Sequence, residues 1–111
     1  MPRKRALEDD LPEVYREDLG DDAEVALYYR WRDHHDIAAA QVLVGHHRHL
    51  VTEIAKRYDT SGVAWEDLTG EAHLGLMRAV CRFDPDQGVP FTTYAAACIR
   101  ASIRQFVQRA A

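Results

Sequence analysis

The fold of this chain is decided by the stretch Asp67-Leu-Thr-Gly-Glu-Ala-His-Leu-Gly-Leu-Met-Arg-Ala-Val-Cys-Arg-Phe-Asp84. The helix should end at Asp84-Pro85, because proline disfavours helical geometry at the residue before it, and Gly88 supplies a loop. The sequence therefore predicts a helix from about Trp65 to Phe83, followed by a sharp corner. Apolar residues recur along it at the three- and four-residue spacing of one helix side: Trp65, Leu68, Leu74, Leu76, Met77, Val80 and Phe83.

The segments on either side continue the helical pattern. Downstream, Thr92 or Thr93 is expected to cap a helix that runs to the end of the chain. Upstream, a turn is expected at residues 59–62, after a longer helix from about Ile37 to Tyr58 that Gly45 weakens locally. The apolar sides of these two helices are Tyr94, Ala95, Ile99, Ile103, Phe106 and Val107, and Ala40, Leu43, Val44, Leu50, Val51, Ile54, Ala55 and Tyr58.

A shorter helix is predicted from about Ala23 to Asp33, with Asp21 or Asp22 as its cap and Asp36 near the start of the next helix. Its apolar stripe comprises Val25, Leu27, Tyr28 and Trp31. No alternating strand pattern of useful length occurs, so the fold class predicted is all-α, a compact bundle of about four helices. Residues 1–21 contain two prolines and clustered charges and are interpreted as a mobile arm or a short docking segment, which leaves residues 22–111 as the domain.

Composition bounds the class of protein. A chain of 111 residues has room for one small domain, and 47% hydrophobic with 29% charged residues is typical of a soluble globular protein. The basic residues 3–5 lead into acidic residues and not an apolar run, which argues against a secretory signal and favours the cytoplasm. Cys81 and Cys98 lack metal-site spacing and are expected to be inert thiols.

Charge is distributed unevenly along the chain. Residues 1–36 carry six Lys or Arg and eleven Asp or Glu (6 − 11 = −5), whereas residues 37–111 carry eight and seven (8 − 7 = +1). From Gln87 to the end there are three arginines and no acidic residue. Contact with nucleic-acid phosphates, if it occurs, belongs to this last segment. The alternative is a solvated arginine face that interacts favourably with the dipole of the terminal helix.

The stretch from Asp67 to Asp84, with Gly88 and Phe91-Thr92-Thr93-Tyr94-Ala95 after it, resembles conserved region 2 of the sigma-70 family. The likeness extends upstream to Trp31-Arg32 and Asp36-Ile37-Ala38-Ala39-Ala40, and it covers roughly residues 22–109, with the heat-shock type most similar. The resemblance implies a fold like sigma factor domain 2 and a role in transcription initiation without enzymatic activity or a cofactor. The family's later domains are missing, so we expect a sigma factor cut short.

In this family the third helix docks on the clamp helices of the largest catalytic subunit of RNA polymerase. The matching positions here are Asp67, Glu71, His73 and Met77, whose spacing lets them share a broad helix stripe. A methionine flanked by acids suits a basic, partly apolar partner. Alternatively, Met77 fills the core and the acids form a solvated face. Gly70 stands where the family normally presents a glutamine.

The fourth helix of the family separates the DNA strands and holds an extruded base by aromatic stacking, worth about 1–3 kcal/mol per base. By this resemblance Phe91, Thr93 and Tyr94 are DNA-binding residues, with Tyr94 as stacking platform and Thr93 as phosphate donor. The alternative for Tyr94 is a core aromatic with its hydroxyl at the rim. Helical spacing adds Arg104, with Arg100 adjacent, to the same DNA-binding surface.

This helix departs from the family at the residues that open DNA. Ala97 and Cys98 replace the paired tryptophans that wedge the duplex, and Gln87 stands where an arginine commonly lies beside the flipped base. Losing two stacking groups should cost several kcal/mol of melting, so opening by this chain alone is not expected. Gln87 remains among the expected DNA-binding positions.

The second helix carries His47-Arg48-His49 in place of the family's asparagine-centred stretch, which helps to hold a second unstacked base, so His47 is also an expected DNA-binding residue. His46 and His49 are three residues apart and could share a face as metal ligands. Two histidines without a third ligand do not define a site, so no metal is expected and polar surface positions explain them better.

Three functions compete. The leading one is a truncated sigma-like activator that binds RNA polymerase core and contacts a −10-like promoter element, with a DNA-binding protein partner for upstream recognition. It is similar to the two-part activators of gene transfer agents. The second is a module that occupies the polymerase clamp and blocks or redirects a true sigma factor without touching DNA. The third, a hydrolytic or metal enzyme, has no triad, phosphate loop or complete ligand set behind it.

Overall fold

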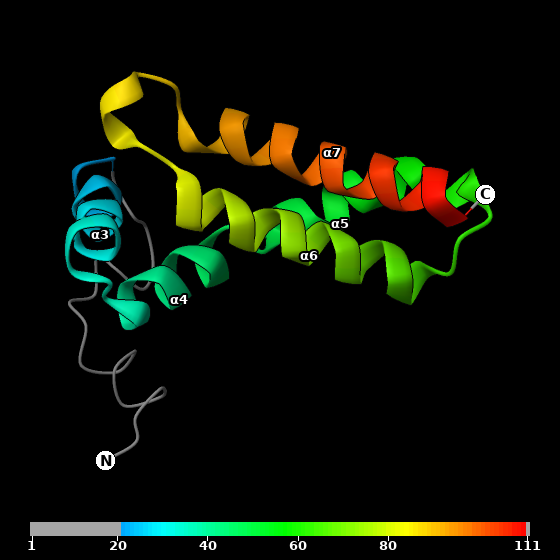
Figure 1. Ribbon diagram of the computed structural model, residues 1–111, viewed down its shortest axis with the longest axis horizontal. Coiled ribbons are helices and arrows are strands. Elements are labelled where there is room, and N and C mark those ends of the chain that lie inside the picture. Colours follow the sequence, from blue (N-terminus) through cyan, green and yellow to red (C-terminus); the bar gives the residue numbers. More distant parts are fainter. Residues whose placement is uncertain (1–20, 111) are drawn as a thin grey trace, which may run out of the picture. The chain divides into compact units, whose positions relative to one another are not determined.

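The computed structural model describes residues 21–110, and most of these residues lie in helices (Figure 1). No strand occurs between these residues, which confirms the all-α prediction. None of their helices is long and apolar enough to cross a membrane. The mobile arm predicted at residues 1–21 lies almost entirely outside the described residues. The chain divides into two compact units, residues 1–46 and residues 47–111, and the single domain expected from residue 22 onward stays a prediction.

The first unit contains α3 (Asp21–His34) and α4 (Ile37–His46), which pack against each other. The pair buries Leu27 and Tyr28 from α3, and Ala39 and Leu43 from α4. Asp36, which the sequence placed near the start of the second helix, stabilises the sharp connection between the helices. Its carboxylate accepts a hydrogen bond from the backbone N–H of Ala39 at 3.2 Å and pairs with the Arg30 guanidinium at 2.7 Å. An N-cap of this kind stabilises a helix by about 1 kcal/mol.

The long helix predicted from Ile37 to Tyr58 is wrong, because the chain breaks at His47-Arg48. Three shorter elements replace it: α4, α5 (His49–Ala55) and the 3-10 helix η1 (Lys56–Ser61). The backbone N–H of Leu50 donates to the carbonyl of His47, three residues back, so the turn tightens there. The His47 side chain is buried at this break, packed beside the ring of Phe91. Periodicity alone did not reveal that a polar side chain turns inward here.

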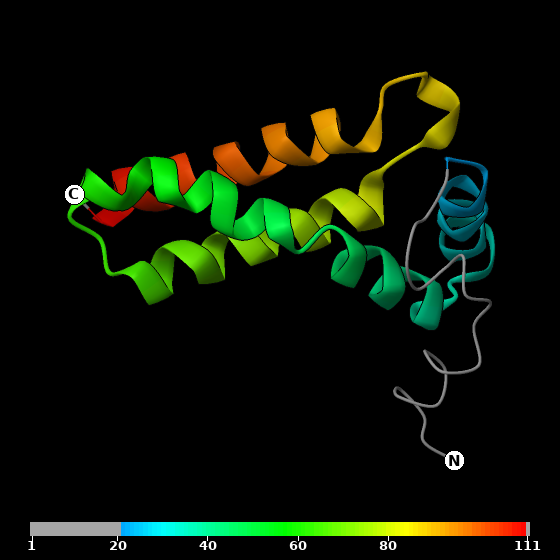
Figure 2. The same cartoon turned by 180° about the vertical axis from the view of Figure 1, so that it is seen from behind.

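The second unit is built on a helical hairpin. The helices α6 (Trp65–Arg82) and α7 (Phe91–Ala110) run antiparallel side by side, and α5 packs against both, as Figures 1 and 2 show from opposite sides. All three helices contribute to the core: Val51, Ile54 and Ala55 from α5, Leu68, Ala72, Leu76, Ala79 and Val80 from α6, and Ala95, Ile99 and Ile103 from α7. Burying each large aliphatic side chain stabilises the unit by about 1.5–3 kcal/mol.

A close approach between α6 and α7 sets the hairpin geometry. A Cβ atom on Gly75 would lie 2.8 Å from the Ile99 Cα atom and 3.1 Å from the Cys98 carbonyl oxygen, so only glycine fits there. Three residues along α6, the Arg78 guanidinium donates a hydrogen bond to the Ser102 hydroxyl at 3.0 Å. Ser102 is buried, and this bond satisfies its hydroxyl. The close approach at Gly75 and the hydrogen bond from Arg78 together fix the register of α7 along α6.

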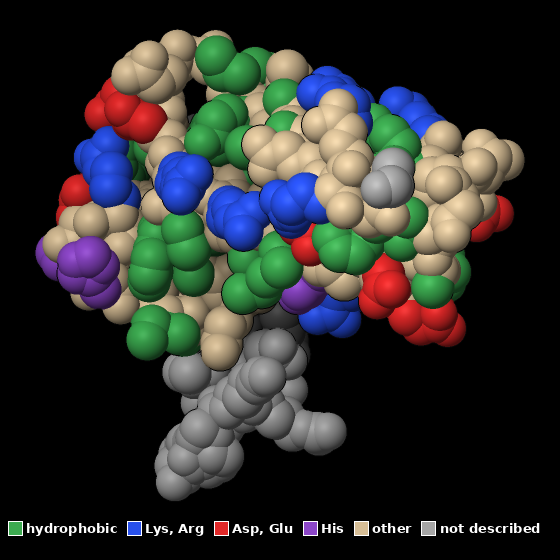
Figure 3. All heavy atoms as spheres, turned by 45° about the vertical axis from the view of Figure 1, so that its right-hand side comes forward, with side chains coloured by type: hydrophobic (Ala, Val, Ile, Leu, Met, Phe, Trp, Pro, Cys, Tyr) green, Lys and Arg blue, Asp and Glu red, His purple; other side chains and the backbone are tan. Residues whose placement is uncertain are grey.

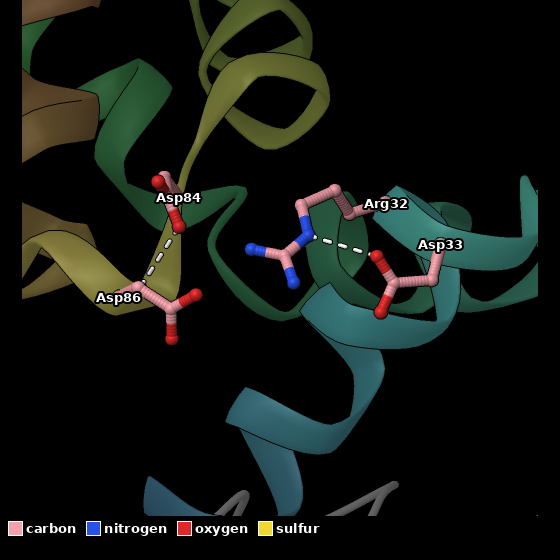
Figure 4. A network of polar contacts seen from close by, with 4 residues as sticks. All are labelled: Arg32, Asp33, Asp84 and Asp86. Atoms are coloured by element: carbon pink, nitrogen blue, oxygen red, sulfur yellow. Dashed lines mark hydrogen bonds and ion pairs between the residues drawn. The ribbon is translucent and has the colours of Figure 1, made fainter.

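The corner predicted after α6 is present and contains the short 3-10 helix η2 (Pro85–Gln87). The Asp84 carboxylate caps it by accepting the backbone N–H of Asp86 at 2.9 Å (Figure 4), and Gly88 follows with a φ of +79°. Figure 4 also shows, within the first unit, the Arg32 side chain donating to the Asp33 carboxylate at 3.0 Å. The Arg32–Asp33 pair is solvent-exposed and contributes little stability.

The caps predicted for the last helix are wrong. The helix α7 begins at Phe91, so Thr92 and Thr93 lie inside its first turn with exposed side chains. The Tyr94 backbone N–H already donates to the Pro90 carbonyl at 3.2 Å, which places the start of the helical hydrogen bonding before either threonine. Both threonines are thereby left facing solvent.

Candidate functional site

The side of α6 that faces away from the core carries apolar residues. Leu74 is 43% exposed and Met77 is 42% exposed, although both belong to the apolar pattern expected to be buried. With Asp67, Gly70 and Cys81, which are also exposed, they lie at spacings of three, four, three and four residues. We call these five residues the α6 face. The prediction that Leu74 is buried is wrong, and so is the alternative that Met77 fills the core.

Acidic and polar residues border the α6 face. Of the four residues expected to bind a partner here, Asp67 and Met77 lie on the face itself, whereas Glu71 and His73 are half-buried at its two edges. In the described part of the chain, no side chain forms a hydrogen bond or ion pair with the carboxylate of Asp67 or Glu71. The structure therefore brings the four residues together around an apolar centre with unpaired negative charge, which suits a basic, partly apolar surface.

Two members of the α6 face were not identified from the sequence. Leu74 was assigned to the core because its spacing from Leu68 and Leu76 is compatible with either the buried or the exposed side of the helix. Cys81 was expected to be an inert buried thiol, but it is exposed. The helical phase of 100° per residue, counted from Asp67, places both residues on the same side as Gly70 and Met77, so this signal was present in the sequence.

The side of α7 that faces solvent carries two arginines. Thr93, Ala97 and Arg104 are exposed in one stripe, and half-buried Arg100 lies next to them at helical spacing. On the surface seen in Figure 3, Lys and Arg side chains lie beside exposed hydrophobic side chains. Guanidinium groups and a hydroxyl in one stripe are the donors with which proteins hold nucleic-acid phosphates. The structure thus groups Thr93, Arg100 and Arg104 on one surface.

Tyr94 lies at the edge of an aromatic cluster. Its ring centroid is 5.7 Å from that of Phe83, which in turn meets Phe91 edge-on at 5.2 Å. The Tyr94 side chain is half-buried, between the two environments considered from the sequence. Burial raises the pKa of its phenol, and the neighbouring Cys98 thiol raises it further. The hydroxyl therefore stays protonated at neutral pH and can donate a hydrogen bond.

Two residues expected to contact DNA are buried. Phe91 is 6% exposed and His47 is 5% exposed, and their ring centroids lie 4.6 Å apart. The expectation that both rings are exposed to DNA is therefore wrong in this conformation, and Phe91 instead packs edge-on against Phe83. Gln87 is exposed on η2, where its amide donates to the Asp84 carboxylate at 3.2 Å.

The remaining candidates do not form a chemical site. Between residues 21 and 110, no three His, Cys, Asp or Glu side chains are grouped so that they could hold a metal ion. The ring of His49 lies 6.4 Å from that of His47 and is exposed. Ala97 is exposed and Cys98 is half-buried beside Tyr94, so neither position offers an aromatic face.

Comparisons with known proteins agree on one family. Residues 43–111 match the model of Sigma-70 region 2. The chain is similar to the RNA polymerase sigma factor RpoH of Caulobacter vibrioides, with 40% identity over 91 residues, and of Zymomonas mobilis, with 38% over 91 residues. The RpoH protein of Rhizobium radiobacter is 40% identical over 86 residues. These alignments cover 78% to 82% of this chain, which spans only about 30% of the length of the relatives.

Proposed function

The chain belongs to the Sigma-70 region 2 family, and from this premise we propose that it binds the core of bacterial RNA polymerase through the α6 face and contacts promoter DNA through α7. A −10-like element is the expected DNA target. Recognition of upstream DNA by a protein partner is part of the same proposal.

The observation that carries the proposal is the exposure of Leu74 and Met77 between acidic residues. Large apolar side chains grouped on a surface are typical of a protein interface, because burying each against a partner yields about 1.5–3 kcal/mol. Asp67 and Glu71 beside them favour a basic partner and steer its approach. The resemblance assigns docking to Asp67, Glu71, His73 and Met77, and packing among residues 21–110 gives no other reason for the exposure of Leu74 and Met77.

Contact with DNA is supported by the stripe on α7. Thr93, Arg100 and Arg104 provide phosphate donors, and Tyr94 provides a half-exposed ring with a protonated hydroxyl. With Ala97 and Cys98 where the family has tryptophans, the stacking energy for holding an opened strand is small. We therefore propose an activator that joins polymerase and a companion protein at the promoter, with strand opening dependent on the rest of the complex.

A second candidate function is a clamp-binding module that blocks or redirects a sigma factor without touching DNA. The burial of Phe91 and His47 favours it, because two positions at which the family contacts bases are closed. A forked promoter fragment separates the two candidates. If the chain is an activator, Tyr94→Ala should abolish binding of the fragment by the complex of chain and polymerase core. If the chain is a blocker, Tyr94→Ala should leave binding unchanged.

The docking step is tested by titrating fluorescently labelled chain with purified polymerase core. Met77→Asp places a charge in the centre of the α6 face, and we expect the affinity for core to fall by a factor of about 100 or more. Gln105→Asp is the matched control, since Gln105 is an exposed polar residue of α7 outside both stripes. Unchanged affinity of the Met77→Asp variant would remove the α6 face from the proposal.

A further inference from the structure

Packing among residues 21–110 does not explain the glycine at position 70. It lies inside α6, where glycine weakens a helix relative to alanine. At Gly75 the neighbouring helix demands glycine, but a Cβ atom on Gly70 would meet nothing within 4 Å. Gly70 is exposed, and it occupies the middle of the α6 face. A glycine in such a place fits the close approach of another molecule to the helix backbone.

The residues around Gly70 form a socket. Asp67, Gly70, Glu71 and Leu74 stand at positions i, i+3, i+4 and i+7, the arrangement in which four residues of one helix surround a side chain from a facing helix. In this arrangement Asp67 and Leu74 stand at the two ends and Gly70 and Glu71 at the two flanks, so the flank at Gly70 carries no side chain. No side chain in the described part of the chain pairs with either carboxylate.

Arginine is the side chain whose chemistry matches this socket. Its aliphatic stem packs on apolar surface such as Leu74, and its planar guanidinium donates to carboxylates in a forked geometry. Lysine would place a compact charge with fewer donors, and an apolar side chain would leave both carboxylates beside a dry contact without partners. A side chain larger than hydrogen at position 70 would fill the space that the stem needs.

We propose that Gly70 is a specificity-determining residue, which opens a socket on α6 for an arginine side chain of the RNA polymerase core. This inference rests on the proposed docking function and deepens it. The glutamine that the resemblance gives as usual at this position would occupy the socket itself. Gly70 therefore gives this chain a docking geometry of its own, in which the two helices lie closer together at this point.

The experiment measures affinity for purified polymerase core and thermal stability for Gly70→Ala and Gly70→Gln in the full chain. Both substitutions improve helix propensity, so the melting temperature should rise by a few degrees in each. Affinity should nevertheless fall, by about threefold to tenfold for alanine and by more than about tenfold for glutamine. Glu71→Gln, which keeps size and removes charge, should weaken binding and reduce its dependence on salt.

Gly45→Ala is the matched control, because Gly45 is another exposed glycine whose Cβ would meet nothing within 4 Å. We expect this variant to bind core as the unmodified chain does. If Gly70→Gln binds core as tightly as the unmodified chain or more tightly, the proposed arginine socket is refuted. Gly70 would then only lack a contact that a glutamine side chain makes with core. If the unmodified chain itself does not bind core, the proposed docking function is refuted, and this measurement distinguishes that outcome from failure of the socket alone.

Discussion

Replacing Gly75 with alanine should force α6 and α7 apart. The added Cβ would lie 2.8 Å from the Ile99 Cα atom and 3.2 Å from the Ser102 Cβ atom. Carbon atoms pack best at about 3.5–4.0 Å, so the helices must separate by roughly 0.7 Å or more. The nearest obstacle is backbone, which cannot rotate away as a side chain could. The change should therefore disturb the hairpin and not only one rotamer.

The size of the effect follows from two opposing contributions. Overpacking a close helix contact costs about 3 kcal/mol, at the upper end of its usual range because backbone atoms collide. Better helix propensity returns about 1 kcal/mol, which leaves a net loss of about 2 kcal/mol. Gly70→Ala makes the same chemical change in the same helix where space is open, so it should gain about 1 kcal/mol. The free energies of unfolding of the two variants should therefore differ by about 3 kcal/mol, with Gly75→Ala less stable and Gly70→Ala more stable than the unmodified chain.

Urea and thermal unfolding followed by far-UV circular dichroism measure this difference directly. We expect the melting temperature to fall by roughly 10 °C for Gly75→Ala and to rise by roughly 5 °C for Gly70→Ala. If Gly75→Ala proves as stable as the unmodified chain, then α6 and α7 do not approach as described, and the positions of both functional faces must be revised.

Three further outcomes follow from the geometry. Burial raises the pKa of the Tyr28 phenol far above its usual value, so the unfolded state loses this proton first as the pH rises. The stability that is present below about pH 10 should therefore decline at higher pH, and in urea unfolding Tyr28→Phe should remove that decline. Arg100→Ala and Arg104→Ala should each lower the salt dependence of DNA binding by about one phosphate contact, and an unchanged slope would exclude that arginine from the interface. Ser102→Ala should lose about 1 kcal/mol of unfolding free energy, and combining it with Arg78→Ala should cost less than the sum of the single losses.

The sequence predicted those parts of the fold that depend on local chemistry. The apolar period of α6 identified a helix, and Asp84-Pro85 identified its end, because each signal acts within a few residues. The break at His47-Arg48 was missed, and periodicity also did not show that His47 is buried beside Phe91, a residue 44 positions away (91 − 47 = 44). The threonine caps failed because Pro90 already begins the hydrogen bonding of α7.

The candidate site was predicted less completely than the fold. A resemblance carries residue identities to matching positions, but it does not carry burial, so Phe91 and His47 were expected at the DNA surface and lie in the aromatic cluster. Conversely, Leu74 reads as a core residue in any apolar pattern, and only the helical phase of α6 against α5 and α7 exposes it. Apolar spacing alone did not separate Leu74 from the core, whereas the helical phase counted from Asp67 would have placed it on the α6 face.

The central claim, that the α6 face meets polymerase, is tested most directly by photo-crosslinking. A photoreactive amino acid is placed at Met77 in one variant and at Gln105 in another, and each is irradiated with purified polymerase core. Our account predicts a crosslink from position 77 to the largest catalytic subunit and none from position 105. Absence of any product at position 77, or equal products at both positions, would contradict it.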